Sequence, residues 1–222
     1  LLRQVVRKRA TITFPSLEND PIEHISTKYS FPSWIVELWL KWWGVDETQR
    51  LCAAMNEQPQ MHIRVNTLKT SPQEVQEHLE RSGISVTPGN FAPDVLQVQP
   101  GHLVVKDSWL STGRYYIQDE SSALVGHAAQ VEPGHVVYDL CSAPGGKATH
   151  LGQLMRNEGE IKAFDLSTKR LEMVKMNAQR LGITIIDTGQ GDASSALNLA
   201  PADRVLVDAP CSGLGTMRHR PD

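Results

Sequence analysis

The stretch that decides the fold reads Val136-Val137-Tyr138-Asp139-Leu140-Cys141-Ser142-Ala143-Pro144-Gly145-Gly146-Lys147-Ala148-Thr149-His150-Leu151. Its β-branched apolar start is typical of a strand, its Pro-Gly-Gly centre is typical of a tight loop, and the remainder follows a helical pattern. A strand, a loop and a helix N-terminus form the unit with which α/β proteins bind nucleotide-like ligands. The sequence therefore predicts a ligand site at residues 141–147.

Three aspartates, Asp165, Asp192 and Asp208, follow the next three predicted strands. Asp165 has the place at which a carboxylate commonly binds a ribose. A single aspartate at a strand end is often only a helix cap or a turn former. Because the carboxyl ends of parallel strands meet at one edge of a sheet, the three together predict a single crevice.

The loop fits some nucleotide ligands better than others. It lacks the G-x-G-x-x-G pattern of dinucleotide sites, and it is not a P-loop, because Ala148 rather than Ser or Thr follows Lys147. It offers close backbone approach and free N–H groups at a helix start, with Asp165 for a ribose and Asp192 for an adenine amine. These parts suit S-adenosylmethionine better than NAD, because its carboxylate can bind to the N–H groups of the loop.

A second informative stretch is Asp208-Ala209-Pro210-Cys211-Ser212-Gly213. A cysteine after proline at the carboxyl end of a strand is expected to face the crevice, where a helix N-terminus would lower the pKa of its thiol. The alternative is that Cys211 is a small buried apolar residue. Cys52 and Cys141 are expected to be structural side chains. The spacing of the 3 cysteines and 8 histidines indicates no metal site.

Composition limits the class of protein. The chain has 222 residues, of which 40% are hydrophobic and 21% charged, with a formal net charge of −3. This length suffices for one large domain or two small ones. A contact with nucleic acid must come from local basic patches rather than bulk charge. No apolar run is long enough to span a membrane, no secretory signal opens the chain, and the cysteine spacing suggests no disulfides. We therefore expect a reducing, cytoplasmic setting.

The N-terminal half is predicted to begin with a linker and continue as a small α+β module. Arg3, Arg7, Lys8 and Arg9 are interpreted as the cationic end of a helix, with a nucleic-acid contact as the alternative. Four apolar residues at helical spacing predict a helix that ends at Gly44 and packs into a core, with base stacking as the alternative: Trp34, Leu38, Trp39 and Trp42. Further elements are a strand at 61–65, a helix after a Ser71–Glu74 capping box, and strands at 84–87, 95–98 and 102–105.

The C-terminal half alternates strands with helices. Helices are predicted at 121–130 and 147–156, after the Ser167 cap, and in short form after Asp192. Strands are predicted at the start of the opening stretch and at 161–164, 183–186 and 204–207. This order is typical of a doubly wound parallel sheet. The pattern stops after four strands, so we expect the chain to be a fragment.

These motifs resemble the RNA cytosine-5 methyltransferases of the NOL/NOP/Sun group, most closely its bacterial members that modify 16S ribosomal RNA. The resemblance covers nearly the whole chain and is carried by residues 139–147, 208–213, 118–122, 64–68 and 29–34. It implies an α/β fold with a Rossmann-like, S-adenosylmethionine-dependent methyltransferase domain, incomplete at the C-terminus, at 113–222. A small RRM-like RNA-binding module would occupy 26–112, and 1–25 would be the end of a preceding domain and a linker.

The resemblance also implies roles for individual residues. Those that would bind S-adenosylmethionine or line its pocket are Cys141, Ser142, Ala143, Pro144, Gly145, Gly146, Lys147, Asp165, Asp192 and Asp208. The family reaction is covalent: a cysteine thiolate adds to carbon 6 of cytosine, carbon 5 takes the methyl group, and a base then removes the carbon 5 proton so that the enzyme is released. Cys211 would assist product release, while Asp208 and Lys147 would contact the cytosine ring.

The sequence departs from the family pattern at the nucleophile. The attacking cysteine of the family follows a threonine on the next strand, and no Thr-Cys pair occurs here. We therefore expect the nucleophile to lie beyond Asp222 and the isolated chain to be inactive. Ser142 also stands where the family often has alanine. Two alternatives stay open: a non-catalytic RNA-binding or ribosome-assembly factor with this fold, and a small-molecule methyltransferase, against which the large N-terminal half argues. The expected partner is 16S ribosomal RNA, bound by a cytoplasmic monomer.

Overall fold

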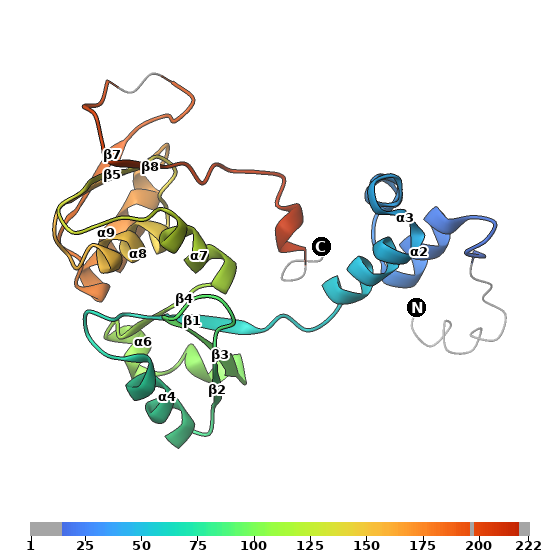
Figure 1. Cartoon of the computed structure of the whole chain (residues 1–222), viewed down its shortest axis with the longest axis horizontal. Helices are drawn as coiled ribbons and strands as arrows, with labels where there is room; N and C mark the ends of the chain where they lie inside the picture. Colours follow the sequence, from blue (N-terminus) through green and yellow to red (C-terminus); the bar gives the residue numbers. More distant parts are fainter. Residues whose placement is uncertain (1–14, 196–197, 218–222) are drawn as a thin grey trace. The chain divides into compact units, whose positions relative to one another are not determined.

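A computed structural model describes residues 15–195 and 198–217 (Figure 1). The chain divides into two compact units, a helical unit formed by Leu1–Pro59 with Gly213–Asp222 and a two-sheet unit formed by Gln60–Ser212. The basic cluster from Arg3 to Arg9 lies outside the described residues. No helix in the described part of the chain combines the length and apolar character that a membrane crossing requires.

The helical unit contains α2 (Pro21–Tyr29), α3 (Ser33–Met55) and the short 3₁₀ helix η2 (Leu214–Thr216). Asp20 caps α2 by accepting a hydrogen bond of 3.0 Å from the N–H of Glu23. Gly44, with φ of 73°, breaks α3 at the predicted place, because only glycine adopts this conformation without strain. The core of the unit consists of Ile25, Ile35, Val36, Trp39 and Cys52, with Leu214 and Met217 packed against it.

The predicted core role of the tryptophans is correct for Trp39 alone. Trp39 is 5% exposed, but Trp34 and Trp42 are each 59% exposed. The helix buries the face that carries Ile35 and Trp39, and this face is rotated from the one carrying Trp34 by one residue, or about 100°. The spacing identified the helix correctly, and the error was in the choice of its buried face.

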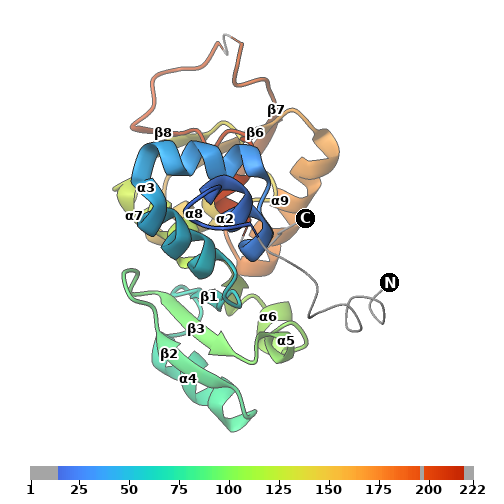
Figure 2. The same cartoon turned by 90° about the vertical axis from the view of Figure 1, so that its right-hand side faces the viewer.

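The first sheet is antiparallel, with the strand order β2-β3-β1-β4. Its strands are β1 (Met61–Val65), β2 (Ser85–Pro88), β3 (Val95–Gln99) and β4 (Tyr115–Ile117). The capping box is present at α4 (Pro72–Arg81), since Ser71 and Glu74 bond each other's backbone N–H groups. Figure 2 shows α4 along β2 and β3.

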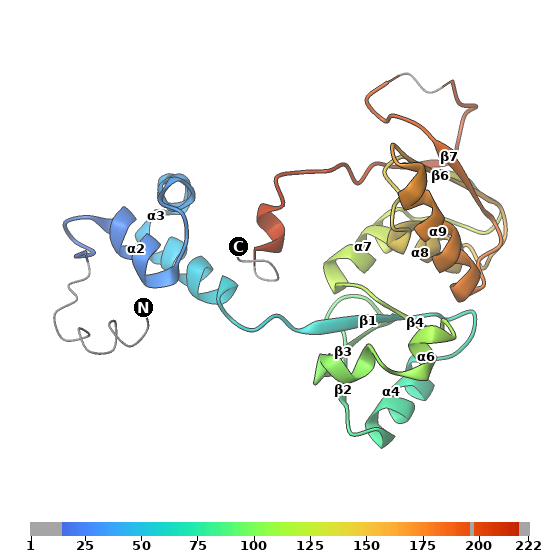
Figure 3. The same cartoon turned by 180° about the vertical axis from the view of Figure 1, so that it is seen from behind.

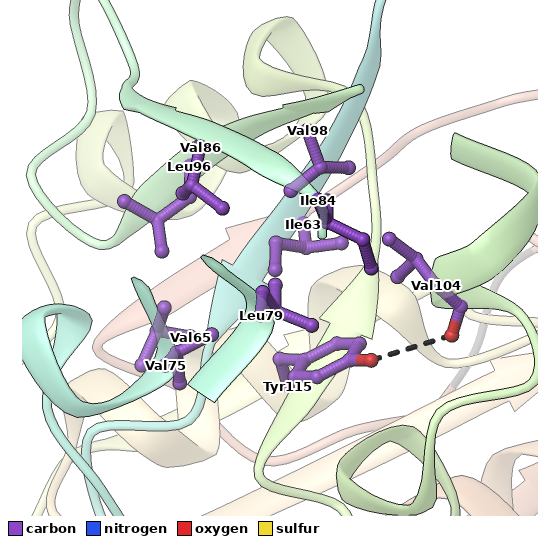
Figure 4. Close-up of a cluster of buried hydrophobic side chains, with 10 residues drawn as sticks. All are labelled: Ile63, Val65, Val75, Leu79, Ile84, Val86, Leu96, Val98, Val104 and Tyr115. Carbon is purple, nitrogen blue, oxygen red and sulfur yellow. Dashed lines mark hydrogen bonds between the residues drawn. The ribbon is translucent and has the colours of Figure 1, made fainter. Parts of the chain in front are cut away.

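The predicted strand at 102–105 is wrong. This segment forms α5 (Gly101–Val104), which is followed by α6 (Ser108–Ser111), and the missed strand β4 takes the place beside β1. Val104 points into the core of the antiparallel sheet, where its carbonyl accepts a hydrogen bond of 3.3 Å from the hydroxyl of Tyr115 (Figure 4). An apolar residue in a short helix can fill the same core space as a strand residue, which the four-residue pattern could not distinguish.

The second sheet is parallel, with the strand order β7-β6-β5-β8. Its strands are β5 (Val136–Asp139), β6 (Glu160–Asp165), β7 (Ile186–Gln190) and β8 (Arg204–Leu206). The helices α7 (Glu120–Ala128), α8 (Gly146–Leu154) and α9 (Thr168–Leu181) lie side by side in one layer on one side of this sheet (Figures 1 and 3). The α/β fold with a Rossmann-like parallel sheet is confirmed.

Two local predictions in this sheet need correction. The strand predicted at 183–186 begins only at Ile186, because the N–H of Ile183 bonds the carbonyl of Ala178 at 2.9 Å and closes the end of α9 around Gly182. The described residues between β7 and β8 form a turn at Asp192 instead of the predicted short helix. The Asp192 carboxylate accepts the N–H of Ser194 there, which favours a turn.

The strand order creates a crevice. The chain runs from β5 outward to β6 and β7 and then returns to β8 on the other side of β5. In open parallel sheets such a reversal separates the loops that follow the two neighbouring strands, and ligands bind between them. Here those loops begin after Asp139 and after Leu206.

Candidate functional site

The loop after β5 is held by side chains that bond its carbonyl oxygens. The four bonds run from Arg170 Nη2 to Ala143 O at 2.7 Å, from Asn177 Nδ2 to Pro144 O at 2.9 Å, from Thr149 Oγ1 to Gly145 O at 2.7 Å, and from Arg64 Nη1 to Gly146 O at 2.7 Å. Each peptide group is planar, so a bond to its oxygen also fixes the direction of its N–H. The backbone of the loop is therefore held in one orientation before any ligand binds.

The loop ends at the N-terminus of α8, which has no side-chain cap. Gly145 is the N-cap residue with φ of 98°, and a Cβ at this position would lie 3.0 Å from the Cα of Val174. Glycine is thus required by both conformation and space. Because the first N–H groups of a helix have no partner within it, this end of α8 can bind an anionic group.

A hollow of about 190 Å³ lies where the loops after β5 and β8 meet. Its lining consists of Gln118, Asp119, Ser122, Cys141, Ser142, Ala143, Pro144, Gly146, Lys147 and Asp208. Six predicted residues of the β5 loop and Asp208 thus share one cavity. Gly145, Asp165, Asp192 and Cys211 were predicted for the same site and are not in its lining.

Lys147 and Asp208, which both line the hollow, form an ion pair. The Lys147 Nζ lies 2.5 Å from the Asp208 Oδ2, and the two side chains are 18% and 55% exposed. The pair joins the first turn of α8 to the segment after β8, which lie 61 residues apart in the chain. It places one proton donor and one acceptor on the wall of the cavity.

Asp165 supports the loop from β6. Its Oδ2 accepts the N–H of Ala143 at 3.3 Å and lies 3.4 Å from Arg170 Nη1, and its Oδ1 accepts the N–H of Ser167 at 3.0 Å. Each carboxylate oxygen has acceptor capacity for a further bond. The role of Asp165 toward a ligand stays a prediction.

Asp192 belongs to the turn after β7. Its Oδ1 accepts both the N–H of Ser194 at 2.9 Å and the hydroxyl of Ser194 at 2.7 Å. The hydrogen bonds from Ser194 lower the pKa of Asp192. The role of Asp192 toward a ligand stays a prediction.

Asp139 is a buried carboxyl group behind the loop. It is 1% exposed, and neither of its oxygens makes a hydrogen bond with the described residues. Burial raises the pKa of Asp139 to about 6, although nearby polar groups of Ser142 and Cys141 and the charge of Lys147 act in the opposite direction. The sequence suggested no ionisable role for this residue.

The three cysteines have different environments. Cys52 is buried, and burial raises the pKa of its thiol to about 11. Burial and the charges of neighbouring aspartates raise the pKa of Cys141. The structural role of its side chain stays a prediction. Cys211 is exposed, which contradicts the alternative that it is a buried apolar residue.

Sequence reasoning missed several residues of the site. Gln118, Asp119 and Ser122 precede or begin α7 and line the hollow, while Arg64 reaches the loop from β1. The segments 64–68 and 118–122 were noted only as carriers of a family resemblance. Their appearance as motifs was the one available signal that they belong to the site.

Two family descriptions match this chain. The description "16S rRNA methyltransferase RsmB/F" matches residues 127–222, and the RsmF/B-like ferredoxin-like domain matches residues 31–104.

Curated relatives and a solved structure agree with them. The chain is 34% identical over 220 residues to the probable ribosomal RNA small subunit methyltransferase B of Bacillus subtilis, covering 98% of this chain and 49% of the relative. It is 36% identical to the protein of the same name from Synechocystis, covering 89% and 45%. A crystal structure of a methyltransferase homolog from Pyrococcus horikoshii superposes with a TM-score of 0.80 at 30% identity, covering 90% of this chain and 66% of that one.

The chain spans about half the length of the curated relatives it matches. The two family descriptions agree with each other and with the sheets on which they fall, and six residues of the loop line one cavity with Asp208. The chain therefore belongs to the RsmB/F family of 16S rRNA methyltransferases.

Proposed function

We propose that the protein containing this chain binds S-adenosylmethionine at the β5 loop and methylates carbon 5 of a cytosine in 16S ribosomal RNA. The observation that carries the proposal is one cavity whose lining includes both residues of the loop and the Lys147–Asp208 pair. The backbone of the loop suits a cofactor, and the ion pair suits a polar heterocycle.

The residues present fit S-adenosylmethionine. The uncapped N-terminus of α8 suits its carboxylate, the free acceptor capacity of Asp165 suits ribose hydroxyls, and Gly145 and Gly146 permit close backbone approach. When bound, the cofactor supplies an activated methyl group on a sulfonium. The chain contributes orientation of that group through the held carbonyl groups of the loop.

The acid and base chemistry is assigned to the ion pair. Addition of a cysteine thiolate to carbon 6 of cytosine moves an electron pair into the ring, so a donor at the ring edge lowers the barrier. Lys147 and Asp208 are 2.5 Å apart and can share a proton with the ring while the adduct exists. After carbon 5 has taken the methyl group, a base removes the carbon 5 proton, the C–H electron pair re-forms the double bond between carbons 5 and 6, and the carbon 6–sulfur bond breaks to release the thiolate.

The attacking cysteine is proposed to be one other than the three in this chain, since none follows a threonine. Cys211 is proposed to assist release. Residues 26–112 are proposed as the RNA-binding module, and the boundaries after 25 and 112 stay predictions, as do the cytoplasmic location and the monomeric state.

The test is mass spectrometry of 16S ribosomal RNA, both naked and in small-subunit particles, after incubation with the full-length protein and S-adenosylmethionine. We expect 5-methylcytosine at one position. Methylation of a different atom would contradict the cytosine-5 assignment. Cofactor binding without transfer on any RNA form would instead favour the non-catalytic assembly factor. In parallel, residues 1–222 alone are expected to form no 5-methylcytosine.

A further inference from the structure

Arg64 belongs to β1 of the antiparallel sheet, but its guanidinium group lies against the β5 loop of the parallel sheet, which is called the cofactor loop below. The side chain is fully buried, with the residue 1% exposed. Its Nη1 donates to Gly146 O at 2.7 Å and to Gln118 Oε1, and its Nη2 donates to Thr149 Oγ1 at 3.2 Å. Two of the three groups that Arg64 bonds, Gly146 O and Thr149 Oγ1, thus lie in the first turn of α8.

Burying the charged guanidinium group of Arg64 costs free energy, because the charge loses its hydration. None of the ion pairs among the described residues includes Arg64, and its Nε has no hydrogen-bond partner there. Burial lowers the pKa of Arg64 to about 10. An apolar side chain of similar volume would cost less to bury here. The placement of the charge therefore calls for an explanation other than stability.

The bond to Gly146 O has a directional consequence. This oxygen and the N–H of Lys147 belong to one planar peptide group and point in opposite directions. An anchor on the oxygen therefore aims the N–H of Lys147 out of the N-terminus of α8, where Gly146 and Lys147 line the hollow. Thr149 Oγ1 holds Gly145 O in the same way and so fixes the N–H of Gly146.

We propose that Arg64 is a positioning residue for the cofactor. It holds the peptide between Gly146 and Lys147 in the orientation that binds the carboxylate of S-adenosylmethionine, so the antiparallel module contributes directly to cofactor affinity. The proposal rests on the proposed function, because the ligand of the loop is taken to be S-adenosylmethionine.

A matched control is available in Arg180. This arginine is partly buried, whereas Arg64 is fully buried. It donates to the carbonyls of Leu110 at 2.5 Å and Tyr115 at 3.5 Å, and its Cζ lies 5.5 Å from the ring of Tyr116. The Cζ of Arg64 lies 5.4 Å from the same ring. Arg180 Nη2 also donates to Asn177 Oδ1 at 3.1 Å, so Arg180 reaches the loop only through another side chain, whereas Arg64 bonds a carbonyl of the loop directly.

The experiment is calorimetric titration of the full-length protein with S-adenosylmethionine, comparing the unsubstituted protein with Arg64→Met, Arg64→Lys and Arg180→Met. Loss of a hydrogen bond from a charged donor is expected to weaken binding about 10- to 100-fold in Arg64→Met. Arg64→Lys should be intermediate, because one ammonium cannot reproduce the forked contact. Arg180→Met should bind within about threefold of the unsubstituted protein, even at equal loss of thermal stability.

A second variant keeps the proposal testable if Arg64→Met does not fold. Thr149→Val removes the hydroxyl that bonds both Arg64 and the loop, so it should weaken binding, and its effect should not add to that of Arg64→Lys. The amide proton shift of Lys147 in the free protein provides a readout independent of binding, and Arg64→Lys should change it.

The outcomes separate the two hypotheses. The positioning role alone would be overturned if the unsubstituted protein binds the cofactor and folded Arg64→Met binds it with equal affinity. Equal affinity in both Arg64→Lys and Thr149→Val would overturn it as well. The same holds if Arg180→Met weakens binding as much as Arg64→Met. Absence of binding by the unsubstituted protein would contradict the proposed function and this inference with it.

Discussion

Asp94 and His150 are joined by a buried contact of 2.9 Å between the carboxylate Oδ2 and the imidazole Nε2. The other oxygen of Asp94 lies 2.7 Å from Nε2 of His127, and Gln153 Nε2 donates to Oδ2 at 3.1 Å. Asp94 immediately precedes β3, whereas His127 lies in α7 and the other two lie in α8. A single carboxylate therefore fixes two helices of the parallel sheet to the antiparallel sheet.

Asp94, His127 and His150 have the spacing of a metal site, since one ligand atom from each lies within 4.8 Å of the others. A metal-bound histidine normally donates its other ring N–H to an acceptor. The Nδ1 of His150 is buried and has no partner among the described residues. We therefore interpret the cluster as a hydrogen-bond network in which each Nε2 carries the proton, a tautomer inferred from the contacts.

His150 is predicted to make the protein less stable in mild acid. Burial lowers the pKa of His150 to about 4, from 6.5 in an unfolded chain. Between these values the unfolded state binds the proton and the folded state does not, so stability is complete above pH 6.5 and falls as the pH drops toward 4. The loss amounts to at most about 3 kcal/mol. His150→Gln should flatten this slope in thermal unfolding, whereas His102→Gln at an exposed site should not. An unchanged slope in His150→Gln would contradict the assignment.

Asp139 is predicted to make the folded protein less stable as the pH rises, which is opposite to the effect of His150. Its folded pKa of about 6 exceeds the ordinary 3.8, so the folded state binds more protons between these values, and stability falls as the pH rises through this window. Asp139→Asn should therefore stabilise the protein above pH 6, by up to about 3 kcal/mol. Thermal unfolding at neutral pH measures the effect, with the exposed Asp187→Asn as the control. Equal or lower stability of Asp139→Asn would show that the ionised carboxylate has a stabilising partner.

The different environments of Trp39 and Trp34 predict different losses of stability when each is replaced by alanine. Trp39→Ala removes a side chain from the core of the helical unit and should cost about 3–5 kcal/mol. Trp34→Ala removes an exposed ring and should change stability by less than about 0.5 kcal/mol. Denaturant unfolding of both variants provides the comparison. Similar losses would mean that another part of the protein covers Trp34.

The sequence predicted the local structural elements but missed the contacts between segments that are far apart in the chain. The strand, loop and helix around Gly145 depend on neighbouring residues, and so does the capping box at Ser71. The contacts of Arg64 with Gly146 and of Asp94 with His150 join residues 82 and 56 positions apart, and no periodicity in one sequence relates them. The loop could therefore be identified from the sequence, but the side chains that hold it from the antiparallel sheet could not.

Asp208 is predicted to serve the chemical step rather than cofactor binding. Asp208→Asn keeps the size of the side chain but removes the charge that pairs with Lys147. Methyl transfer by the full-length protein should fall by about 10²- to 10⁴-fold, the usual contribution of acid–base catalysis. The dissociation constant of S-adenosylmethionine should change little, and Asp187→Asn should change neither quantity. A loss of cofactor binding equal to the loss of rate would place Asp208 in the cofactor site instead.

Cys211→Ser distinguishes a release function from attack on the base. Cys211 is exposed and follows Asp208 by three positions, outside the lining of the hollow. If it assists release, the variant of the full-length protein should still attack the RNA and then accumulate a covalent complex that survives denaturing electrophoresis. Cys52→Ser, at a buried site in the helical unit, should give no such complex. If Cys211→Ser instead abolishes methylation without any trapped complex, Cys211 is itself the nucleophile. The segment after β8 then contains both the nucleophile and Asp208.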